Sequence, residues 1–405
     1  MHHTDLLVIG AGPAGAATAA RAAAAGLRVT LVDRARFPRD KPCAEYLSPE
    51  TVRQLDLLDA LPPPVRSAGH VLAGTTVHGP GGAQLTGLFA QVESARHGPR
   101  PAGLALPRMI LDAAILDVAR GRGAVVREGL ALEQLLYHRG TVAGGVFRTR
   151  DGQLETISAR LTVGADGIRS RVARQIGGYR TGFPSRVAFV GHLEGVSDLT
   201  DRAEMHVGAE GYVGINPLGG RRANVSVVVP TALSASASGR PEEYFRQVLA
   251  SFPALRHRLA RTEVVRAVLV TGPFGGRARR LVAGGALLVG DAAEFFDPFT
   301  GEGICSALRG ATLAVDTALE ALAAPGLVAR PRLAGYARAH RRAFAGKRVV
   351  ERLIGYAMFT PRLFDRAVER IERRGWSHTL IGVTGDMLPP SLVLNPRFLT
   401  GLVFG

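Results

Sequence analysis

The stretch "DLLVIGAGPAGAATAARAAAAGLRVTLVDR", residues 5–34, decides the fold that we expect of this chain. It predicts an apolar strand over residues 6–9, a glycine turn, a helix from about Pro13 to Ala25 and a second strand that ends at Asp33. A strand, a glycine turn, a helix and a strand with a terminal acid, in this order, are typical of a dinucleotide-binding unit. We therefore expect an α/β protein that opens with a Rossmann-like unit.

The glycines of this turn have the spacing GxGxxG: Gly10, Gly12 and Gly15. This spacing allows a tight turn, a close approach of the backbone to a pyrophosphate, and close packing of the helix on the strand. The helix N-terminus adds free N–H groups and a positive dipole end, and Pro13 in the first helical turn removes only an N–H that would be unpaired. Asp33 stands where a carboxylate can accept hydrogen bonds from ribose hydroxyls.

Two later segments also place an acid directly after an apolar strand. They are "LTVGADGIRSRVAR" (161–174), with Asp166-Gly167, and "GALLVGDAAEFFDPFTGEGICSALRG" (285–310), with Gly290-Asp291. In the second segment, a helix is expected to begin at about residues 301–303. The sequence has no second GxGxxG motif, which excludes an enzyme with separate flavin and nicotinamide Rossmann domains.

Together the three segments resemble the flavoprotein superfamily of the p-hydroxybenzoate hydroxylase type. Two short stretches, "RFPRDKPC" (36–43) and "DPFTGEGI" (297–304), are most similar to its geranylgeranyl reductase branch, which reduces isoprenoid double bonds with reduced FAD. The resemblance implies FAD as cofactor and NAD(P)H as reductant. It also implies a Rossmann-like FAD-binding domain of three layers (ββα), an inserted antiparallel sheet that binds substrate, and a helical C-terminal region.

The domain boundaries follow from this resemblance and from runs of short strands with Gly and Pro turns. One such run, "AEGYVGINPLGGRRANVSVVV" (209–229), predicts a strand, a turn at Pro217–Gly220 and a returning strand. We expect a discontinuous FAD-binding domain (1–70, 100–180 and 272–326), a substrate-binding sheet domain (71–99 and 181–271) and a helical C-terminal cap (327–405).

The resemblance also implies which residues bind FAD. Asp291 would contact the ribityl or pyrophosphate region, and the loop that follows it would pass the isoalloxazine ring. A helix that begins near Gly303 would direct free N–H groups toward the negative charge of a reduced flavin. The expected cofactor-binding residues are Gly10, Gly12, Pro13, Ala14, Gly15, Asp33, Arg34, Lys41, Cys43, Arg108, Asp166, Gly290, Asp291, Pro298, Gly301, Gly303 and Ile304.

Three side chains near the expected ring position are catalytic candidates: Asp297, Glu302 and Cys43. A desolvated carboxyl can be tuned for proton transfer, although an acid in a first helical turn also stabilises the helix dipole, so a structural role is the alternative. The expected substrate contacts are Tyr212, Gly214, Pro217 and Phe296, with Gly214 leaving open space. The only cysteines are Cys43 and Cys305, so we expect no disulfide framework and no metal site.

The chain is basic, with 50 Lys and Arg against 34 Asp and Glu and a net charge of +16. Only Lys41 and Lys347 are lysines, and the arginines are spread along the chain without interleaved aromatic residues. A single-strand nucleic-acid platform needs such aromatic residues, so we expect no nucleic-acid partner. In the segment 341–376, apolar residues recur at helical spacing opposite arginines. Such helices could line an apolar pocket, contact an anionic membrane, bind a pyrophosphate or form a solvated face.

No apolar run is long enough to span a bilayer, and no secretory signal is visible at the N-terminus. The expectation is a cytoplasmic protein, with peripheral membrane association through the basic C-terminal helices as an alternative. The oligomeric state stays open.

Two enzymatic functions fit these observations. The first is FAD-dependent reduction of a C=C bond in an isoprenoid or polyketide-type lipid, which the stretch 297–304 favours. The alternative is an NAD(P)H-dependent flavin monooxygenase that hydroxylates an aromatic or polyketide substrate, since residues 212–217 lack the tryptophan usual in the reductase branch. Trp376 is the only tryptophan, which argues against a halogenase with its tryptophan pair. A non-catalytic flavin- or nucleotide-binding scaffold is a more remote alternative.

Overall fold

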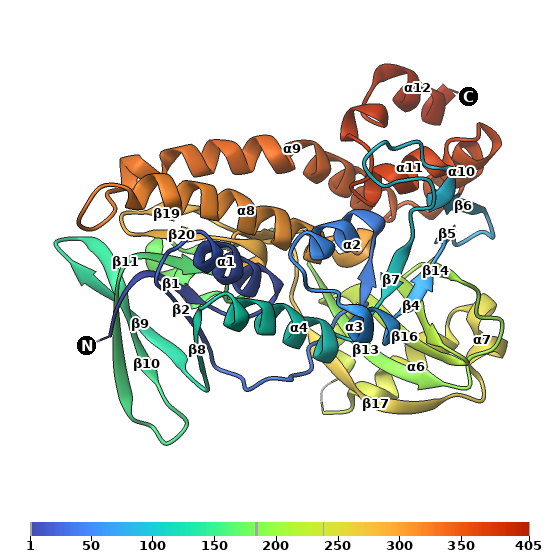
Figure 1. The fold of residues 1–405 in the computed structure, drawn as a ribbon. Helices are drawn as coiled ribbons and strands as arrows, with labels where there is room; N and C mark the ends of the chain where they lie inside the picture. Colours follow the sequence, from blue (N-terminus) through green and yellow to red (C-terminus); the bar gives the residue numbers. More distant parts are fainter. Residues whose placement is uncertain (1, 183–184, 238, 405) are drawn as a thin grey trace.

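The computed structural model describes residues 2–182, 185–237 and 239–404 (Figure 1). Its first sheet has the strand order β19-β20-β11-β1-β2-β8. The strands β1 (His2–Ile9), β2 (Val29–Asp33), β8 (Val125–Glu128), β11 (Leu154–Gly164) and β20 (Ala286–Leu288) are parallel, as in a Rossmann-like domain.

Strand β1 is buried on both faces because its side chains alternate between two cores. Leu6 and Val8 pack with the helices on one face, whereas Leu7 and Ile9 pack with β9 (Ala131–His138) and β10 (Thr141–Arg148) on the other. The helices are α1 (Pro13–Ala24), α4 (Arg108–Gly121) and α8 (Gly303–Leu322). The domain therefore has the three layers that were expected: an antiparallel β layer, the parallel sheet and the helices.

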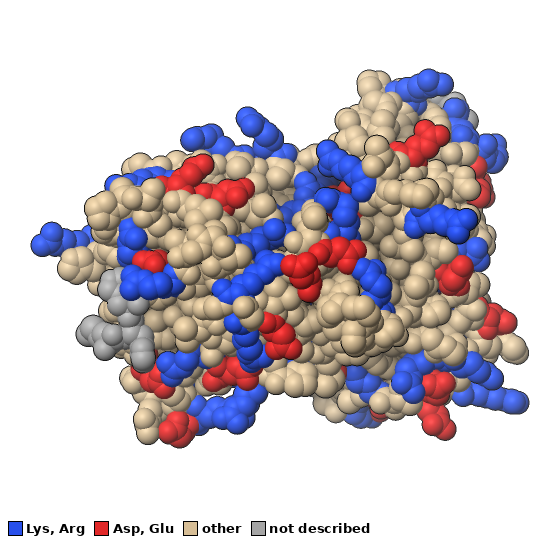
Figure 2. All heavy atoms as spheres, viewed as in Figure 1, with Lys and Arg blue, Asp and Glu red and all other residues tan. Residues whose placement is uncertain are grey.

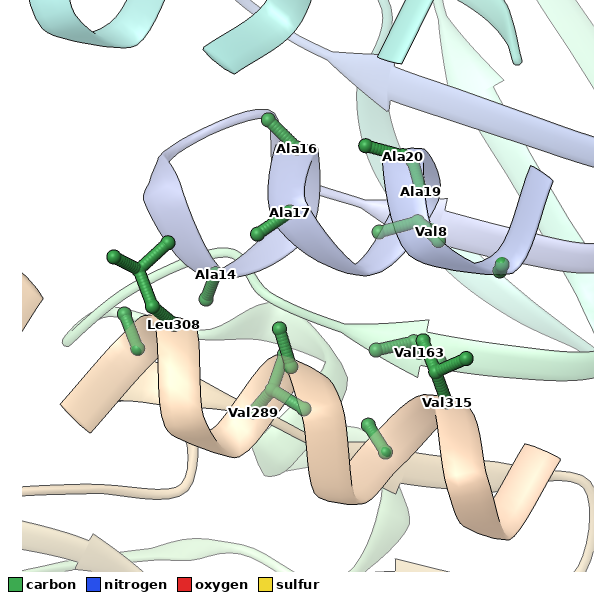
Figure 3. Close-up of a cluster of buried hydrophobic side chains, with 14 of the residues drawn as sticks. Val8, Ala14, Ala16, Ala17, Ala19, Ala20, Val163, Val289, Leu308 and Val315 are labelled. Atoms are coloured by element: carbon green, nitrogen blue, oxygen red, sulfur yellow. The ribbon is translucent and has the colours of Figure 1, made fainter. Parts of the chain in front are cut away.

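Helices α1 and α8 pack closely because their contact surface consists largely of small residues. Figure 3 shows Ala14 and Ala17 of α1 on the side of Leu308 and Val315 of α8, above Val289, which follows β20. All five side chains are buried. Alanines bring the two backbones near each other, so both helices begin at the same edge of the sheet.

The second sheet has seven strands in the order β17-β13-β16-β15-β14-β5-β6, antiparallel except for the parallel pair β14 and β5. One face is covered by α6 (Pro241–Ala250) and α7 (Pro253–Leu259), and the other faces the first domain and the C-terminal helices. Its strands are β5 (Gly74–His78), β6 (Gln84–Leu88), β13 (Arg186–Glu194), β14 (Arg202–Val207), β15 (Tyr212–Gly219), β16 (Arg222–Pro230) and β17 (Glu263–Thr271).

The turn predicted at Pro217–Gly220 is shorter than expected. Pro217 belongs to β15 and is buried, and the chain reverses at Gly220 and Arg221, between the paired residues Gly219 and Arg222. Gly219 and Gly220 have positive φ. A two-residue hairpin turn favours glycine at such positions, whereas Pro217 is accommodated at the register shift between Pro217 and Gly219. The prediction that Pro217 starts the turn was therefore wrong.

The C-terminal region is helical, with α9 (Ala334–Ala357), α10 (Pro361–Arg373), α11 (Ser377–Thr384) and α12 (Pro396–Phe404). Helix α9 runs beside α8, and α10 and α11 pack against β6 at the edge of the second sheet (Figure 1). Among the residues of ranges 2–182, 185–237 and 239–404, no helix combines the length and apolar composition needed to cross a membrane.

Short elements connect these layers. The small sheets are β3 (Tyr46–Leu47), β4 (His70–Leu72) with β7 (Gly103–Ala105), and β12 (Tyr179–Thr181), β18 (Gly276–Ala278) with β21 (Glu294–Phe295). The remaining elements are α2 (Pro49–Asp56), α3 (Pro63–Ser67), α5 (Arg171–Ile176), β19 (Val282–Ala283) and the 3-10 turns η1 (Phe89–Gln91), η2 (Leu233–Ala237), η3 (Gly290–Ala292), η4 (Pro298–Thr300), η5 (Arg330–Leu333) and η6 (Pro390–Leu392). The predicted fold class is confirmed; the domain boundaries stay a prediction.

Candidate active site

The glycine turn after β1 accepts no side chain at two of its three positions. A Cβ at Gly10, whose φ is +101°, would lie 2.5 Å from the carbonyl oxygen of Ala165, and a Cβ at Gly15 would lie 1.7 Å from the carbonyl oxygen of Gly10. Gly12 instead lines the large central cavity and is the N-cap of α1. The turn therefore brings the N-terminal N–H groups of α1 to the wall of this cavity.

Two of the predicted acids stabilise turns. Asp33 accepts hydrogen bonds from the backbone N–H of Ala11 at 2.7 Å and of Ala35 at 2.8 Å, so it ties the end of β2 to the glycine turn. Asp166 accepts from Ser170 Oγ at 2.5 Å and from the N–H of Arg171 at 2.6 Å at the start of α5. These bonds assign Asp166 a helix-capping role, and its neighbours, not Asp166 itself, line the cavity.

The central cavity lies between the carboxyl ends of the parallel strands and the second sheet. Of the expected cofactor residues, it is lined by Gly12, Pro13, Ala14, Lys41, Cys43, Arg108, Asp291, Pro298, Gly301, Gly303 and Ile304. The others are not among its lining residues: Gly10, Gly15, Asp33, Arg34, Asp166 and Gly290. The motifs that were far apart in the sequence thus meet at one site.

Buried cations line one side of the central cavity. Arg108 donates two hydrogen bonds to Asp112, at 2.7 and 2.8 Å, and Arg39 pairs with the same carboxylate at 3.1 Å. Burial lowers the pKa of Lys41, and the nearby Arg108 lowers it further, whereas Asp291 opposes this. A negative ligand would relieve this repulsion between cations. Arg39 and Asp112 were missed by the sequence reasoning, although Asp112 stands at the i+4 position from Arg108 on one helix face.

The loop Cys43–Glu45 is held against the second sheet by a buried carboxylate. Glu45 has φ +61° and accepts hydrogen bonds from His192 at 2.8 Å, Asn224 at 3.0 Å, Arg266 at 3.2 Å and the N–H of Arg108 at 3.1 Å. Burial opposes ionisation of Glu45, but His192 and Arg266 outweigh it and lower the pKa of Glu45. The network positions the cavity-lining Cys43; no sequence motif indicated it.

The loop before α8 is anchored by Asp297. Its carboxylate accepts hydrogen bonds from Tyr212 Oη at 2.7 Å, from Arg186 at 2.5 Å and from the N–H of Phe299 at 3.0 Å. Asp297 is thus a buried, fully bonded cap of η4. The loop then turns so that Gly303, the first residue of α8, lines the central cavity.

A second, apolar cavity adjoins the first. It lies between β5, β6 and β14 of the second sheet and the C-terminal helices α9 to α12. Its lining includes Leu85, Val350, Phe364, Val368 and Phe398. The two cavities share the lining residues Ala44, Tyr46, Met205, Pro298 and Gly301.

The expected substrate residues do not all line the same cavity. Tyr212 and Gly214 line the central cavity, whereas Pro217 and Phe296 lie outside both cavities. The space that Gly214 was expected to leave open is filled, because the sulfur of Met205 lies 3.3 Å from where a Cβ would stand. The apolar pocket that was one alternative for the segment 341–376 is present, since α9 and α10 line this cavity, whereas the contributions of α11 and α12 were missed.

The residues present fit FAD. The glycine turn offers a backbone without side chains, two helix N-termini direct N–H groups into one cavity, and buried cations line its wall. Phosphates bind at helix N-termini, and a reduced flavin carries negative charge, so the donor set and the ligand are complementary. The residues that would hold FAD are those of the α1 start, of Lys41 to Cys43, of Arg108, and of the α8 start.

Comparisons with known proteins agree with this geometry. Residues 3–351 match the family described as FAD binding domain. The digeranylgeranylglycerophospholipid reductase of Methanothrix thermoacetophila is 30% identical over 328 residues, which cover 78% of each chain. The menaquinone reductase of Mycobacterium tuberculosis is 33% identical over 328 residues, covering 77% of this chain and 76% of that protein.

Two solved structures share the fold. A geranylgeranyl bacteriochlorophyll reductase-like protein of Thermoplasma acidophilum has a TM-score of 0.79 at 20% identity, with 100% of both chains covered. A myxobacterial chondrochloren halogenase has a TM-score of 0.80 at 22% identity, covering 96% of this chain and 98% of that one. With the glycine turn, the cationic cavity and the match over residues 3–351 in place, the chain belongs to the FAD-binding-domain family and is an FAD-dependent oxidoreductase.

Proposed function

We propose that this protein reduces a C=C bond of an isoprenoid or polyketide-type lipid, with FAD as the hydride carrier and NAD(P)H as the reductant. The observation that carries the proposal is the apolar cavity that adjoins the central cavity. The names of two relatives support it, since one is a reductase of a digeranylgeranyl lipid and the other a menaquinone reductase.

The apolar cavity suits a long hydrocarbon chain. Its walls are almost entirely aliphatic and aromatic, and the few polar groups among its lining residues include Thr75 and Asn216. Asn216 donates to the carbonyl oxygen of Ala44 at 3.0 Å, so that its amide is partly engaged. Burial of a hydrocarbon chain yields about 25 cal/mol per Å² of apolar surface, which favours a lipid over a small polar substrate.

The residues that line both cavities indicate where the reacting end of the lipid would lie. A lipid that fills the apolar cavity would present one end beside Tyr46, Met205 and Gly301, next to the central cavity. Bound FAD supplies a hydride to one carbon of the double bond. The other carbon takes a proton, so that the alkene gains one hydride and one proton in total, and the Cys43 thiol at the cavity wall is the candidate donor. The protein surrounds the lipid and thereby excludes water from both carbons of the double bond.

We also propose that the protein takes its substrate from an anionic lipid surface. Val349 and Leu353 of α9 and Leu399 of α12 are exposed apolar residues, and Leu353 and Leu399 also line the apolar cavity. Exposed arginines such as Arg352 and Arg397 flank them. Figure 2 shows Lys and Arg side chains on the upper right of the molecule, where α10 to α12 lie, with acids interspersed. Apolar residues beside arginines suit the interface of an anionic bilayer.

The proposed activity can be tested with reduced holoprotein. Anaerobic incubation with a geranylgeranyl lipid, and separately with menaquinone, should give a product heavier by two hydrogens per reduced bond in mass spectrometry. Aerobic turnover with NADPH that instead adds one oxygen atom to an aromatic or polyketide acceptor would favour the monooxygenase. Failure of every isoprenoid substrate to gain hydrogen, with FAD fully reduced, would contradict the proposal.

A further inference from the structure

A third cavity lies between α8 and α9, behind the loop that leads into α8. Unlike the apolar cavity, it is lined largely by charged and other polar side chains. Asp291, Phe295 and Gly303 line both this polar cavity and the central cavity, so the two adjoin at the proposed flavin site. The ionisable side chains of its lining are Asp291, Glu294, Asp297, Glu302, His340, Lys347, Arg348 and Glu351.

Two buried polar atoms of this lining have no hydrogen-bond partner among the described residues. Glu302 is 2% exposed, and its Oε2 accepts hydrogen bonds from Ser48 Oγ at 3.2 Å and Thr51 Oγ1 at 3.5 Å, but its Oε1 has none. The second atom is Nδ1 of His340, which is 6% exposed. Buried polar atoms without partners are rare in proteins, and a polar cavity accommodates the waters that would satisfy them.

The charges around Glu302 favour its protonated form. Carboxylate oxygens of Glu302 and Asp386 and the sulfur of Cys305 lie within 4.8 Å of one another. Lys347 and Arg309 both form ion pairs with Asp386 and leave no cation bonded to Glu302 among the described residues. Both cations therefore pair with Asp386, and Glu302 is left buried beside this second carboxyl group.

The pKa values agree with this arrangement. Burial raises the pKa of Glu302 to about 8, with Lys347 opposing and Asp386 adding to the shift. Burial also raises the pKa of Glu351, at the other end of the cavity, to about 7, against an opposing effect of Lys347. The groups that face Glu302 or the cavity from each packed element are Tyr46 of β3, Cys305 and Arg309 of α8, His340, Lys347, Arg348 and Glu351 of α9, Asp386 after α11, and Asp291, Glu294 and Asp297 of the preceding loop.

Two-electron reduction of FAD takes up at least one proton, as FAD plus two electrons and one proton gives FADH⁻. We propose that Glu302 holds a proton at Oε1 for this uptake and is reprotonated from solvent through the polar cavity, by way of Glu351. Glu302 is the N-cap of α8, one residue before Gly303 of the central cavity. It acts through water in the cavity and is a proton-holding residue, not one that touches the ring.

The inference rests on FAD and not on the lipid substrate, so it can fail or succeed independently of the proposed reduction. The first measurement is the infrared spectrum of the holoprotein in H2O and D2O near neutral pH. A buried carboxylic acid gives a carbonyl stretch that shifts in D2O, and in E302Q this band should weaken to the part that Glu351 contributes. It should persist in the control E50Q, because Glu50 is a buried acid bound to Arg53 and lies outside the cavity lining.

The second measurement is anaerobic stopped-flow reduction of FAD by dithionite, without any substrate. In E302Q, the reduction rate should fall at least about tenfold and lose its dependence on pH between about pH 6 and pH 9. Glu302→Asp, which keeps a carboxyl, should restore part of the rate. In E351Q the infrared band should remain, while the solvent isotope effect on reduction increases.

Two results would overturn the proposal. One is a wild-type holoprotein without a protonated buried carboxyl near neutral pH, or an E302Q protein whose band is as strong as that of the wild type. The other is an E351Q protein with the same reduction rate and isotope effect as the wild type. Because Glu351 lies on α9 and is half-buried, this variant decides the question even if E302Q does not retain FAD.

Discussion

Tyr212 of β15 donates a hydrogen bond to Asp297, and this contact joins the second sheet to the loop before α8. Because Arg186 of β13 binds the other oxygen of the same carboxylate, two strands of the sheet position one acid. Burial raises the pKa of Tyr212 well above its usual range, and the Asp297 carboxylate raises it further, so the hydroxyl remains a donor. The second sheet thereby sets the conformation of the loop at the central cavity.

Replacement of Asp297 by Asn should destabilise the protein by about 3 kcal/mol, since Arg186 is buried and would lose its ionic partner. Tyr212→Phe removes one neutral donor and should cost about 1 kcal/mol. Urea unfolding at constant FAD concentration measures both changes. An equal decrease in the free energy of unfolding for the two variants would show that the ion pair contributes no more to stability than the neutral hydrogen bond.

Gly15→Ala should abolish FAD retention, because its Cβ would lie 1.7 Å from the carbonyl oxygen of Gly10 and would displace the turn. Gly121→Ala is the matched control, since no atom lies within 4 Å of the added Cβ at this helical position, and stability should rise by up to about 1 kcal/mol. The flavin absorbance of each purified variant, before and after added FAD, gives the answer. A yellow Gly15→Ala protein would refute the assigned role of the turn.

Ala357→Phe should narrow the apolar cavity, of which Ala357 is a lining residue. We expect kcat/KM for a long isoprenoid substrate to fall at least about tenfold, corresponding to about 1.4 kcal/mol, with a smaller effect on a short one. FAD binding should not change. Ala345→Phe adds the same ring to an exposed position of the same helix and serves as control. Identical kinetics of the two variants would place the substrate elsewhere.

The stability of the wild type should fall as pH rises through about 8. Glu302 has a folded-state pKa of about 8, above its unfolded value, so the folded state binds more protons between these values. Its contribution is therefore present at low pH and is lost as the pH passes the folded pKa. E302Q should show a weaker decline in thermal stability from about pH 6 to about pH 9. A decline equal to that of the wild type would locate the titration in another group.

Leu353→Ser combined with Leu399→Ser should reduce sedimentation with anionic phosphatidylglycerol vesicles severalfold, because both exposed side chains would enter the interface. Binding of the wild type should weaken as salt rises and should be weak with neutral phosphatidylcholine vesicles. Leu57→Ser, at an exposed leucine of the first domain, is the control. Equal binding of all three proteins to anionic vesicles would exclude this face as the contact.

The sequence predicted those parts of the molecule whose signals are local. The glycine turn, Asp33 and the start of α8 each lie in one contiguous stretch, and the residues of these stretches meet as expected. The Glu45 network was not predictable, because its donors come from three strands that follow more than a hundred residues later. Pro217 was assigned to a turn on its residue type, but tertiary packing and a register shift place it in a strand.

The alanine contact between α1 and α8 has a consequence for ligand length. Both helices begin at the central cavity, at Gly12 and Gly303, and their side-by-side packing leaves little freedom for one start to move relative to the other. The separation of two positive helix ends is thereby a property of the apoprotein, set before any cofactor arrives. A ligand must carry its negative groups at that separation to bind both helix N-termini. The alanines between α1 and α8 therefore determine which cofactor length this protein accepts.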